Sequence, residues 1–217
     1  MPIQAVIFDM DGVLIDSEPH YNAADERLLN SLGIKFGERE AAAITGSSYR
    51  GIPAILRSWN PDITHGDDEI IRMYIDSLTN ALVENVNELI PGAAEWIEYF
   101  RSKGLKTAIG SSSESNMVYH VINKFNLKPD AVVTGSDVEK GKPAPDIFLE
   151  CAKRLGVPPE NCLVIEDSQN GVNAAANAGM VCAAFLGTRC HNFDLSAADI
   201  SIDAYDGENL AKIEELP

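Results

Sequence analysis

Apolar residues recur along this chain in two patterns that favour different secondary structures. Short, nearly continuous apolar runs are typical of strands buried on both faces, whereas apolar positions spaced by three and four residues are typical of helices. The runs predict strands over 5–8, 106–110, 131–134, 163–165, 181–185 and 199–202. After residue 92 they alternate with predicted helices over 93–103, 114–125, 145–155, 169–178 and 207–215. Such alternation predicts an α/β fold with a Rossmann-like parallel sheet core and helices on both faces.

A long helical segment separates the first predicted strand from the second. We predict no strand in this segment, and its helical spacing covers 17–32, 38–44, 49–58 and 67–86. Leu89-Ile90-Pro91-Gly92 then signals a boundary. We therefore expect an α/β catalytic core from 1–16 and 89–217, with a small α-helical cap domain, 17–88, inserted after the first strand. Because ligands of open α/β sheets bind beyond the carboxyl ends of the strands, the insert is expected to act as a lid there.

Two carboxylates, Asp9 and Asp11, follow the first predicted strand directly, and Gly12 stands behind them. Like charges at a strand end repel each other unless a cation offsets them, and Mg²⁺ takes carboxylate and carbonyl oxygens. The pattern fits an acidic turn behind a core strand, and it fits equally a nucleophile and an acid–base partner supported by a metal. The choice between these interpretations depends on the rest of the chain.

Three more polar clusters follow predicted strands. Ser111 and Ser112 precede a helix and suit an anion, although a serine run at this place is also an ordinary helix cap. Lys142 lies in a loop fixed by two prolines and suits a phosphate, unless it is a solvated surface lysine. Glu166 and Asp167 repeat the acidic strand end and suit the oxygen shell of Mg²⁺. The alternative is that Asp167 or Ser168 caps the next helix, which does not exclude metal binding.

The order of these clusters favours one chemistry over the separate alternatives. Acids, hydroxyls and a lysine that converge on one edge of a sheet are the groups that Mg²⁺-assisted phosphoryl transfer needs. The sequence has no G-x-x-x-x-G-K-[ST] motif, which disfavours a nucleotide-dependent P-loop mechanism.

Composition narrows the class of partner. The chain has 217 residues, 45% of them apolar, and a net charge of −16, which argues against nucleic acid or an anionic membrane as the main partner. No stretch approaches the roughly 18 consecutive apolar residues of a membrane helix, and no signal peptide is apparent. We therefore expect a cytoplasmic protein, with a monomer as the default state. An anionic substrate would need local cations in so acidic a chain.

The four cysteines show no C-x-x-C spacing. Cys151, Cys162 and Cys182 lie among apolar residues and are expected to be buried thiols. A zinc site built from Cys190, His191 and distant partners is the less favoured alternative.

The four motifs, in their order, resemble those of haloacid dehalogenase (HAD) superfamily phosphohydrolases, in the branch with β-phosphoglucomutase and sugar-phosphate phosphatases. The first reads Asp9-Met-Asp-Gly-Val-Leu-Ile-Asp-Ser-Glu18, and the others are Ser111 after Ile-Gly, Lys142 in Gly-Lys-Pro-Ala-Pro-Asp, and Glu166-Asp167-Ser168. The resemblance covers the whole chain. It implies a Mg²⁺-dependent phosphatase that acts on a small phosphorylated metabolite, a sugar phosphate foremost.

The resemblance also implies a role for each motif. Asp9 would attack phosphorus and form an aspartyl-phosphate, and Asp11 would protonate the leaving alkoxide and then deprotonate the attacking water. Ser111, Ser112 and Lys142 would hold the phosphoryl oxygens.

The same resemblance implies where the metal binds. Mg²⁺ would sit on the Asp9 carboxylate, the backbone carbonyl of Asp11 and Asp167, with Glu166 in or beside its shell.

Substrate choice is expected to lie in the cap. Thr45–Arg50 resembles a family segment whose glycine and arginine face the site, which makes Gly46 and Arg50 substrate-binding candidates, with His20 after the first motif as a third. A solvated Arg50 is the alternative. The mutases usually carry a histidine where this chain has Tyr21 and a lysine near Glu114, and both departures favour a phosphatase. A mutase-like phosphoryl transferase and a non-catalytic binding protein on the same fold remain as alternatives.

Overall fold

The computed structural model describes residues 3–44, 49–188 and 193–216. The chain divides into two compact units, Met1–Asp16 with Glu88–Pro217 and Ser17–Asn87. The first unit is an α/β structure and the second is helical over its described residues. The two units meet in sequence just after the motif that carries Asp9 and Asp11.

Six strands of the described residues form one parallel sheet in the order β3-β2-β1-β4-β5-β6. Their bounds are Ala5–Phe8 for β1, Lys106–Gly110 for β2, Ala131–Val133 for β3, Cys162–Glu166 for β4, Val181–Phe185 for β5 and Ile200–Ile202 for β6. Strand β1 lies in the interior of the sheet, and its last residue, Phe8, pairs with Ile109 on one side and Ile165 on the other. This register brings the carboxyl ends of β1, β2 and β4 side by side.

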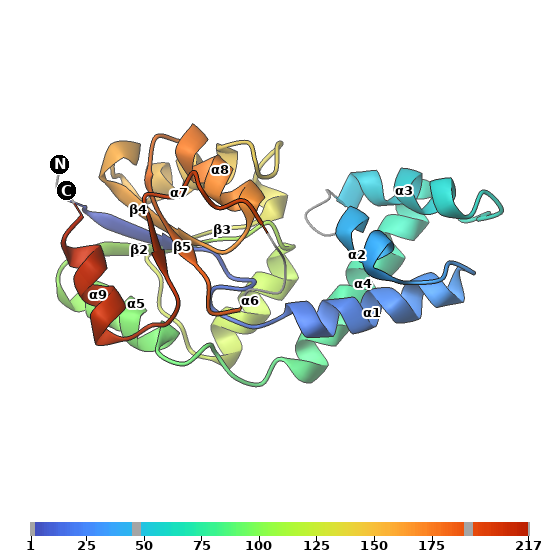
Figure 1. Ribbon diagram of the computed structural model, residues 1–217, viewed down its shortest axis with the longest axis horizontal. Helices are drawn as coiled ribbons and strands as arrows, with labels where there is room; N and C mark the ends of the chain where they lie inside the picture. Colours follow the sequence, from blue (N-terminus) through green and yellow to red (C-terminus); the bar gives the residue numbers. More distant parts are fainter. Residues whose placement is uncertain (1–2, 45–48, 189–192, 217) are drawn as a thin grey trace. The chain divides into compact units, whose positions relative to one another are not determined.

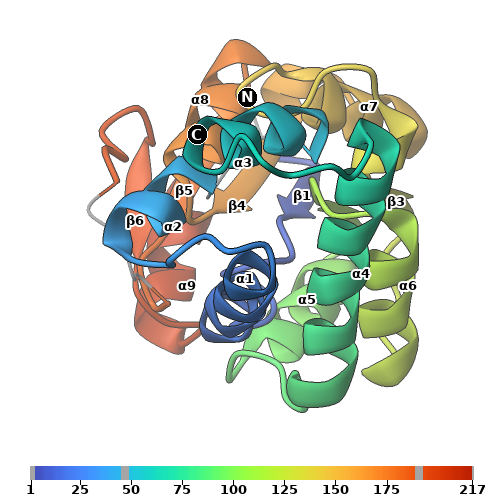
Figure 2. The ribbon, with the colours of Figure 1, turned by 90° about the vertical axis from the view of Figure 1, so that its right-hand side faces the viewer.

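Helices cover both faces of this sheet, as the sequence predicts. In Figures 1 and 2, α7 and α8 lie on one face and α5, α6 and α9 on the other. The bounds are Ala93–Ser102 for α5, Ser115–Lys124 for α6, Asp146–Leu155 for α7, Gln169–Asn177 for α8 and Gly207–Glu214 for α9, and two short 3₁₀ turns span Gly135–Asp137 and Pro159–Asn161. The α/β fold class is therefore confirmed.

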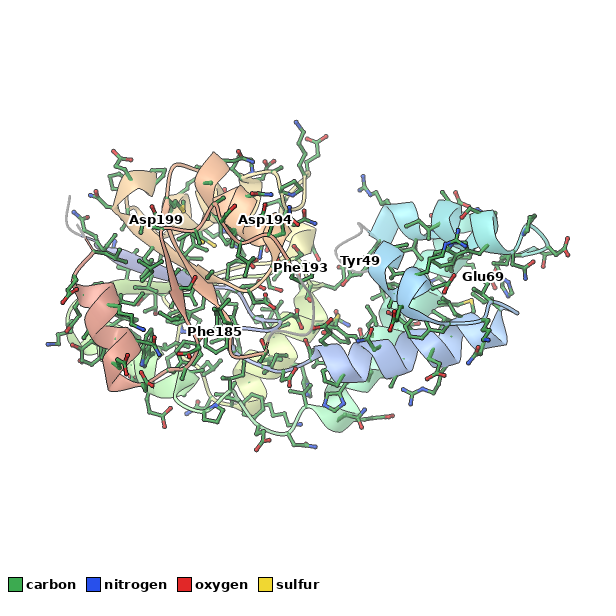
Figure 3. The ribbon with its side chains drawn as sticks, in the orientation of Figure 1. Tyr49, Glu69, Phe185, Phe193, Asp194 and Asp199 are labelled. Carbon is green, nitrogen blue, oxygen red and sulfur yellow. The ribbon has the colours of Figure 1, made fainter. Side chains whose placement is uncertain are left out.

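The second unit is helical because its apolar residues recur at helical spacing. Helix α4 buries Ile70, Tyr74, Leu78 and Leu82 on one stripe and packs against α1. Figure 3 labels Tyr49, in a 3₁₀ turn, and Glu69, in the first turn of α4. The bounds are Glu18–Ser31 for α1, Glu38–Ile44 for α2, Tyr49–Gly51 for the 3₁₀ turn, Ile52–Trp59 for α3 and Asp67–Asn85 for α4. Among the described helices of the chain, none has the length and apolar character needed to cross a membrane.

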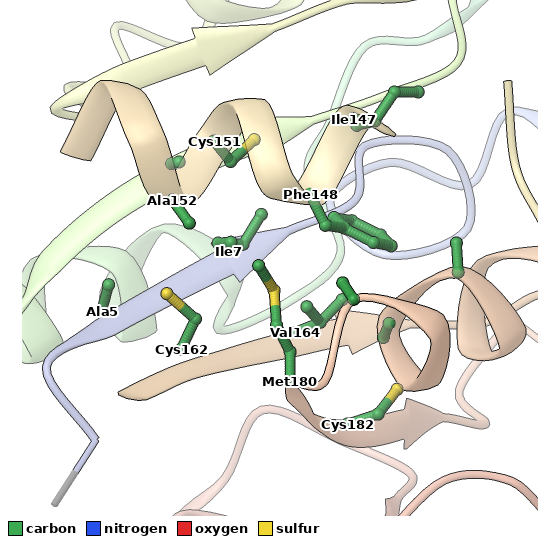
Figure 4. Packing of buried hydrophobic residues seen from close by; sticks show 14 of the residues in the cluster. Ala5, Ile7, Ile147, Phe148, Cys151, Ala152, Cys162, Val164, Met180 and Cys182 are labelled. Carbon is green, nitrogen blue, oxygen red and sulfur yellow. The ribbon is translucent and has the colours of Figure 1, made fainter. Parts of the chain in front are cut away.

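A hydrophobic core of the α/β unit lies between the sheet and helices α7 and α8 (Figure 4). Ile7 of β1 and Val164 of β4 are fully buried there, and Phe148 of α7 is fully buried with them. Strands buried on both faces explain why the sequence shows continuous apolar runs. Cys151, Cys162 and Cys182 are buried free thiols, as predicted, whereas Cys190 and His191 lie outside the described residues.

Candidate active site

Two buried carboxylates meet at the carboxyl ends of β1 and β4. Asp9 follows β1 directly, and its backbone N–H donates to the carbonyl oxygen of Ile165 over 3.0 Å. Glu166 is the last residue of β4 and is 1% exposed, while Asp9 is 7% exposed. The parallel register of the two strands thus puts both acids at one point of the sheet edge.

Lys142 joins the two acids. Its Nζ lies 2.8 Å from Asp9 Oδ1 and 2.8 Å from Glu166 Oε1, and it also donates to the carbonyl oxygen of Gly110 over 3.2 Å. The ammonium group therefore uses its three protons on three acceptors. It lies 4.8 Å from the centre of the Phe148 ring and is almost completely buried. Lys142 is thus a fixed cation at the ends of β1, β2 and β4, and the solvated alternative is wrong.

Burial and neighbouring negative charges raise the pKa of the acids in this cluster. Burial raises the pKa of Asp9 to about 7, Lys142 opposes this rise, and Glu166 and Asp11 add to it. Burial, then Glu166 and Asp9, raise the pKa of Asp167 well above its ordinary value. Burial disfavours the charged form of Lys142 as well, but the carboxylates of Asp9 and Glu166 outweigh it and raise its pKa. One lysine does not offset the acids around it.

Three acids of this cluster have the arrangement of a cation site. One carboxylate oxygen from each of Asp9, Glu166 and Asp167 lies within 4.8 Å of the others. Carboxylate oxygens are the donors that Mg²⁺ prefers. The oxygen donors and the raised carboxyl pKa values both fit a hard divalent cation at this place.

Glu166 is already engaged at both of its oxygens. Oε1 accepts from Lys142, and Oε2 accepts from the backbone N–H of Ser168 over 2.7 Å and from its hydroxyl over 3.0 Å. The Ser168 hydroxyl in turn accepts from the N–H of Gly171 and caps helix α8. Glu166 therefore links the lysine to the start of α8.

Two glycines allow these acids to pack so closely against the backbone. Gly12 has a φ of +73°, and a Cβ added to it would meet Asp167 Oδ2 at 2.0 Å. A Cβ on Gly171 would meet Glu166 Oε1 at 1.6 Å. Both positions exclude a side chain, and Gly12 also needs the left-handed backbone that glycine adopts readily.

The serine run after β2 reaches the other motif acid. The Asp11 carboxylate accepts at Oδ2 from the Ser113 hydroxyl over 2.7 Å. The backbone N–H of Ser113 donates to the Ser111 hydroxyl over 3.0 Å, and Ser111 is buried whereas Ser112 is exposed. The sequence prediction named Ser111 and Ser112 but missed Ser113, for which the only signal was its place in the same run.

Three candidate residues, His20, Gly46 and Arg50, belong to the helical unit. His20 is half-buried on α1, and Arg50 is exposed in the 3₁₀ turn Tyr49–Gly51. Gly46 lies outside the described residues. The predicted residues that the structure brings together are therefore those of the α/β unit.

Comparison with known proteins identifies the family of the chain that carries this cluster. The family model described as a haloacid dehalogenase-like hydrolase matches residues 3–179, which include every motif discussed above. Hexitol phosphatase B of Escherichia coli (strain K12) is 33% identical over 82% of this chain and 81% of its own. A phosphorylated carbohydrates phosphatase of Thermotoga maritima is 34% identical over 82% of each chain.

Among solved structures, a β-phosphoglucomutase from Clostridium difficile matches with a TM-score of 0.81 and 25% identity. The match covers 97% of this chain and 96% of the mutase. Because the motifs, the parallel sheet and the matched sequence all agree, the chain belongs to the haloacid dehalogenase-like hydrolases.

Proposed function

We propose that the protein is a Mg²⁺-dependent phosphatase that hydrolyses a small phosphorylated metabolite, a sugar phosphate foremost, through an aspartyl-phosphate. The observation that carries the proposal is the buried Asp9 held by Lys142 beside Glu166 and Asp167. The names of two relatives, hexitol phosphatase and phosphorylated carbohydrates phosphatase, support the substrate class.

Asp9 is the nucleophile of this proposal. A carboxylate oxygen of Asp9 forms a bond to phosphorus, and the bond between phosphorus and the substrate oxygen breaks. Splitting the displacement into two steps lowers each barrier. Lys142 stabilises the ionised form of Asp9 against the burial that raises its pKa, and so keeps the nucleophile available near neutral pH.

Asp11 supplies the proton chemistry. It gives a proton to the leaving alkoxide in the first step and takes one from the attacking water in the second. In that second step the water oxygen bonds to phosphorus, the bond from phosphorus to Asp9 breaks, and inorganic phosphate and the free Asp9 carboxylate result. The Ser113 hydroxyl holds its carboxyl group through the 2.7 Å hydrogen bond. Ser111 and Ser112 provide donors for the phosphoryl oxygens, and the positive charge of Lys142 stabilises the negative charge that builds up on them in the transition state.

The metal assignment follows from the donor set. Asp9 and Asp167, with the backbone carbonyl of Asp11, would hold Mg²⁺, and Glu166, whose two oxygens are engaged, would stand beside the shell. When bound, the ion supplies the positive charge that one lysine does not, and so offsets the charge on the phosphoryl group.

We assign the helical segment 17–88 as the cap that selects the substrate. Arg50 is exposed, and its fork of donors suits a second phosphate or sugar hydroxyls. Gly46 and His20 stay substrate-binding predictions of the same kind.

The test of this function is phosphate release from a panel of phosphorylated sugars and polyols, with Mg²⁺ and with EDTA. We expect turnover that EDTA abolishes and added Mg²⁺ restores. Asp9→Asn should lower kcat at least about 10³-fold and leave the melting temperature near that of the wild type. Asp62→Asn, an equal change at an exposed loop position, is the matched control and should keep full activity. Near-normal turnover by Asp9→Asn would refute the mechanism.

A mutase-like phosphoryl transferase is the second candidate, favoured by the close structural match to a β-phosphoglucomutase. The two differ in the acceptor of the phosphoryl group, which is water for one and a sugar hydroxyl for the other. Hexose-phosphate isomerisation, measured with a bisphosphate primer, separates them. Isomerisation faster than phosphate release would replace the phosphatase proposal.

A further inference from the structure

The turn after the first motif is buried and closes on itself. Gly12, Val13, Leu14 and Ile15 are fully or almost fully buried. The N–H groups of Val13, Leu14 and Ile15 all point to the carbonyl oxygen of Met10, and the N–H of Gly12 donates to the carbonyl oxygen of Ile15 over 2.8 Å. The carbonyl groups of Gly12, Val13 and Leu14 must therefore find donors elsewhere, because a buried carbonyl without a donor is costly.

Three distant residues supply these donors in succession. The Thr188 hydroxyl donates to the Gly12 carbonyl over 2.5 Å, and the Tyr205 hydroxyl donates to the Val13 carbonyl over 2.9 Å. The backbone N–H of Ile90 donates to the Leu14 carbonyl over 2.8 Å. Two of the three donors are side-chain hydroxyls from the segment after β5. A substitution that removes either hydroxyl therefore removes a hydrogen bond to the turn.

Tyr205 is itself fixed in place. Its ring stacks on Phe185, the last residue of β5 (labelled in Figure 3), with centroids 4.7 Å apart and planes 16° apart. The ring also meets Trp96 of α5 edge-on at 5.0 Å. The backbone of Tyr205 packs directly against Gly92, since a Cβ added to Gly92 would meet the Tyr205 carbonyl oxygen at 2.4 Å. The phenol oxygen is thus a rigid donor.

The turn that these donors hold is the one that carries Asp11. Asp11 immediately precedes it and pairs with Ile15 in a single β-bridge. Gly12, the next residue, lies against the Asp167 carboxylate. A shift of the turn would therefore move Asp11 relative to Asp9, whose place is set by β1 and Lys142. Thr188 and Tyr205 both lie beyond residues 3–179, the part that the family model matches.

We propose that Thr188 and Tyr205 are positioning residues, whose hydroxyl groups hold the turn 12–15 and thereby aim the carboxyl group of Asp11. The inference rests on the proposed function, because it assigns them to the acid–base step of that reaction. Both hydroxyls bond to backbone carbonyls of the turn and act on the reaction only through Asp11.

The first test compares substrates whose leaving groups differ in their need for a proton. An alkyl phosphate, such as the best sugar phosphate of the panel, needs the acid Asp11, whereas p-nitrophenyl phosphate releases p-nitrophenolate, a stable anion that needs no proton. We expect Tyr205→Phe and Thr188→Val each to lower kcat/KM for the sugar phosphate about tenfold and for p-nitrophenyl phosphate less than about threefold. Thr188→Ser, which keeps the hydroxyl, should stay within about twofold of the wild type.

Tyr99→Phe is the matched control. Tyr99 also packs edge-on against an aromatic ring, Phe100, but its hydroxyl bonds to Glu214 instead of to the turn. It should leave the ratio of the two kcat/KM values unchanged. An equal loss on both substrates by Tyr205→Phe and Thr188→Val, or a lower melting temperature with an unchanged ratio, would overturn the inference.

A second measurement needs no activity. Hydrogen exchange followed by mass spectrometry on the peptide that contains residues 10–16 should be faster in Tyr205→Phe and Thr188→Val than in the wild type and Tyr99→Phe. Unchanged exchange would overturn the inference whatever the kinetics. The wild type could release no phosphate at all while exchange is still faster in Tyr205→Phe and Thr188→Val. The proposed function would then fail, but the inference that these two hydroxyls hold the turn would stand.

Discussion

Gly12 takes a backbone conformation and a position that a residue with a side chain tolerates poorly. Its φ is +73°, and an added Cβ would lie 2.0 Å from Asp167 Oδ2. Gly12→Ala therefore introduces two separate effects, backbone strain and displacement of a predicted metal ligand. Strain of this kind costs about 1–2 kcal/mol.

Gly104→Ala separates the two effects. Gly104 has a φ of +82°, but an added Cβ there meets nothing within 4 Å. We expect both variants to lose about 1–2 kcal/mol of unfolding free energy by urea denaturation. Only Gly12→Ala should also lower kcat at least about tenfold and raise the Mg²⁺ concentration for half-maximal activity. Equal activity of the two variants would contradict the contact between Gly12 and Asp167.

At this scale, sequence reasoning succeeds where residue types are unusual and fails where they are common. Acids at two strand ends and a lysine just before two prolines predicted the groups that meet in the Asp9–Lys142–Glu166 cluster. The bond from Ser113 to Asp11 joins residues 102 positions apart, and serine hydroxyls are common on loops. Nothing local marks which of three serines makes it.

Helix α7 shows how one element connects the core with the site. Phe148 is fully buried in the core, and its ring also lies under the ammonium group of Lys142. Leu149, the next residue, is 39% exposed. Neighbouring positions of one helix thus have opposite environments, as its 3.6-residue period requires.

This contrast predicts the stability of two variants. Phe148→Ala should lower the free energy of unfolding by about 3–5 kcal/mol, because it leaves a cavity between α7 and the sheet. Leu149→Ala, the control, should change it by less than about 0.5 kcal/mol. Thermal and urea denaturation measure both. A similar loss in the two variants would mean that α7 does not bury this face.

Element boundaries were predicted to within about two residues, and the deviations have local causes. The predicted strand 131–134 ends at Val133, because Thr134 instead forms a capping box with Asp137. Strand β4 begins and ends one residue beyond the predicted 163–165, since Cys162 and Glu166 still pair with neighbouring strands. Such choices depend on partners that the segment itself does not reveal.

At the scale of the whole molecule, the sequence predicted a parallel sheet but not the order of its strands. Order depends on which distant segments pair, and the apolar runs of the strands are too similar to encode it. The hydrogen bond from Tyr205 to the turn 12–15 was not predicted for the same reason, since Tyr205 lies 192 positions from Val13. The cap assignment, the monomeric state and the cytoplasmic location stay predictions.

The helical unit carries a buried acid that links its stability to pH. Asp25 is 6% exposed, its Oδ2 lies 3.5 Å from the Tyr74 hydroxyl, and its Oδ1 has no hydrogen-bond partner among the described residues. Burial raises the pKa of Asp25 from 3.8 to about 7, against a smaller opposing effect of the Tyr74 hydrogen bond. Between these values the folded protein keeps a proton that the unfolded chain has lost.

The sign of the pH effect follows from this proton. Because the folded state binds more protons than the unfolded state from about pH 4 to pH 7, the contribution of Asp25 to stability must fall as the pH rises through this window. The full rise in pKa corresponds to at most about 4 kcal/mol. Above pH 7 both states are ionised, and the contribution stays constant at its lowest value.

Asp25→Asn removes this titration, and comparison with the wild type isolates it from Asp9 and Asp167, which titrate in both proteins. We expect the free energy of unfolding of Asp25→Asn, relative to the wild type, to increase by 1 to about 4 kcal/mol between pH 4.5 and pH 8 in urea titrations. Asp76→Asn, at an exposed position of α4, should show no such trend. A difference that is flat with pH, or that falls as the pH rises, would show that Asp25 is ionised in the folded protein and that its carboxylate has a partner or solvent access.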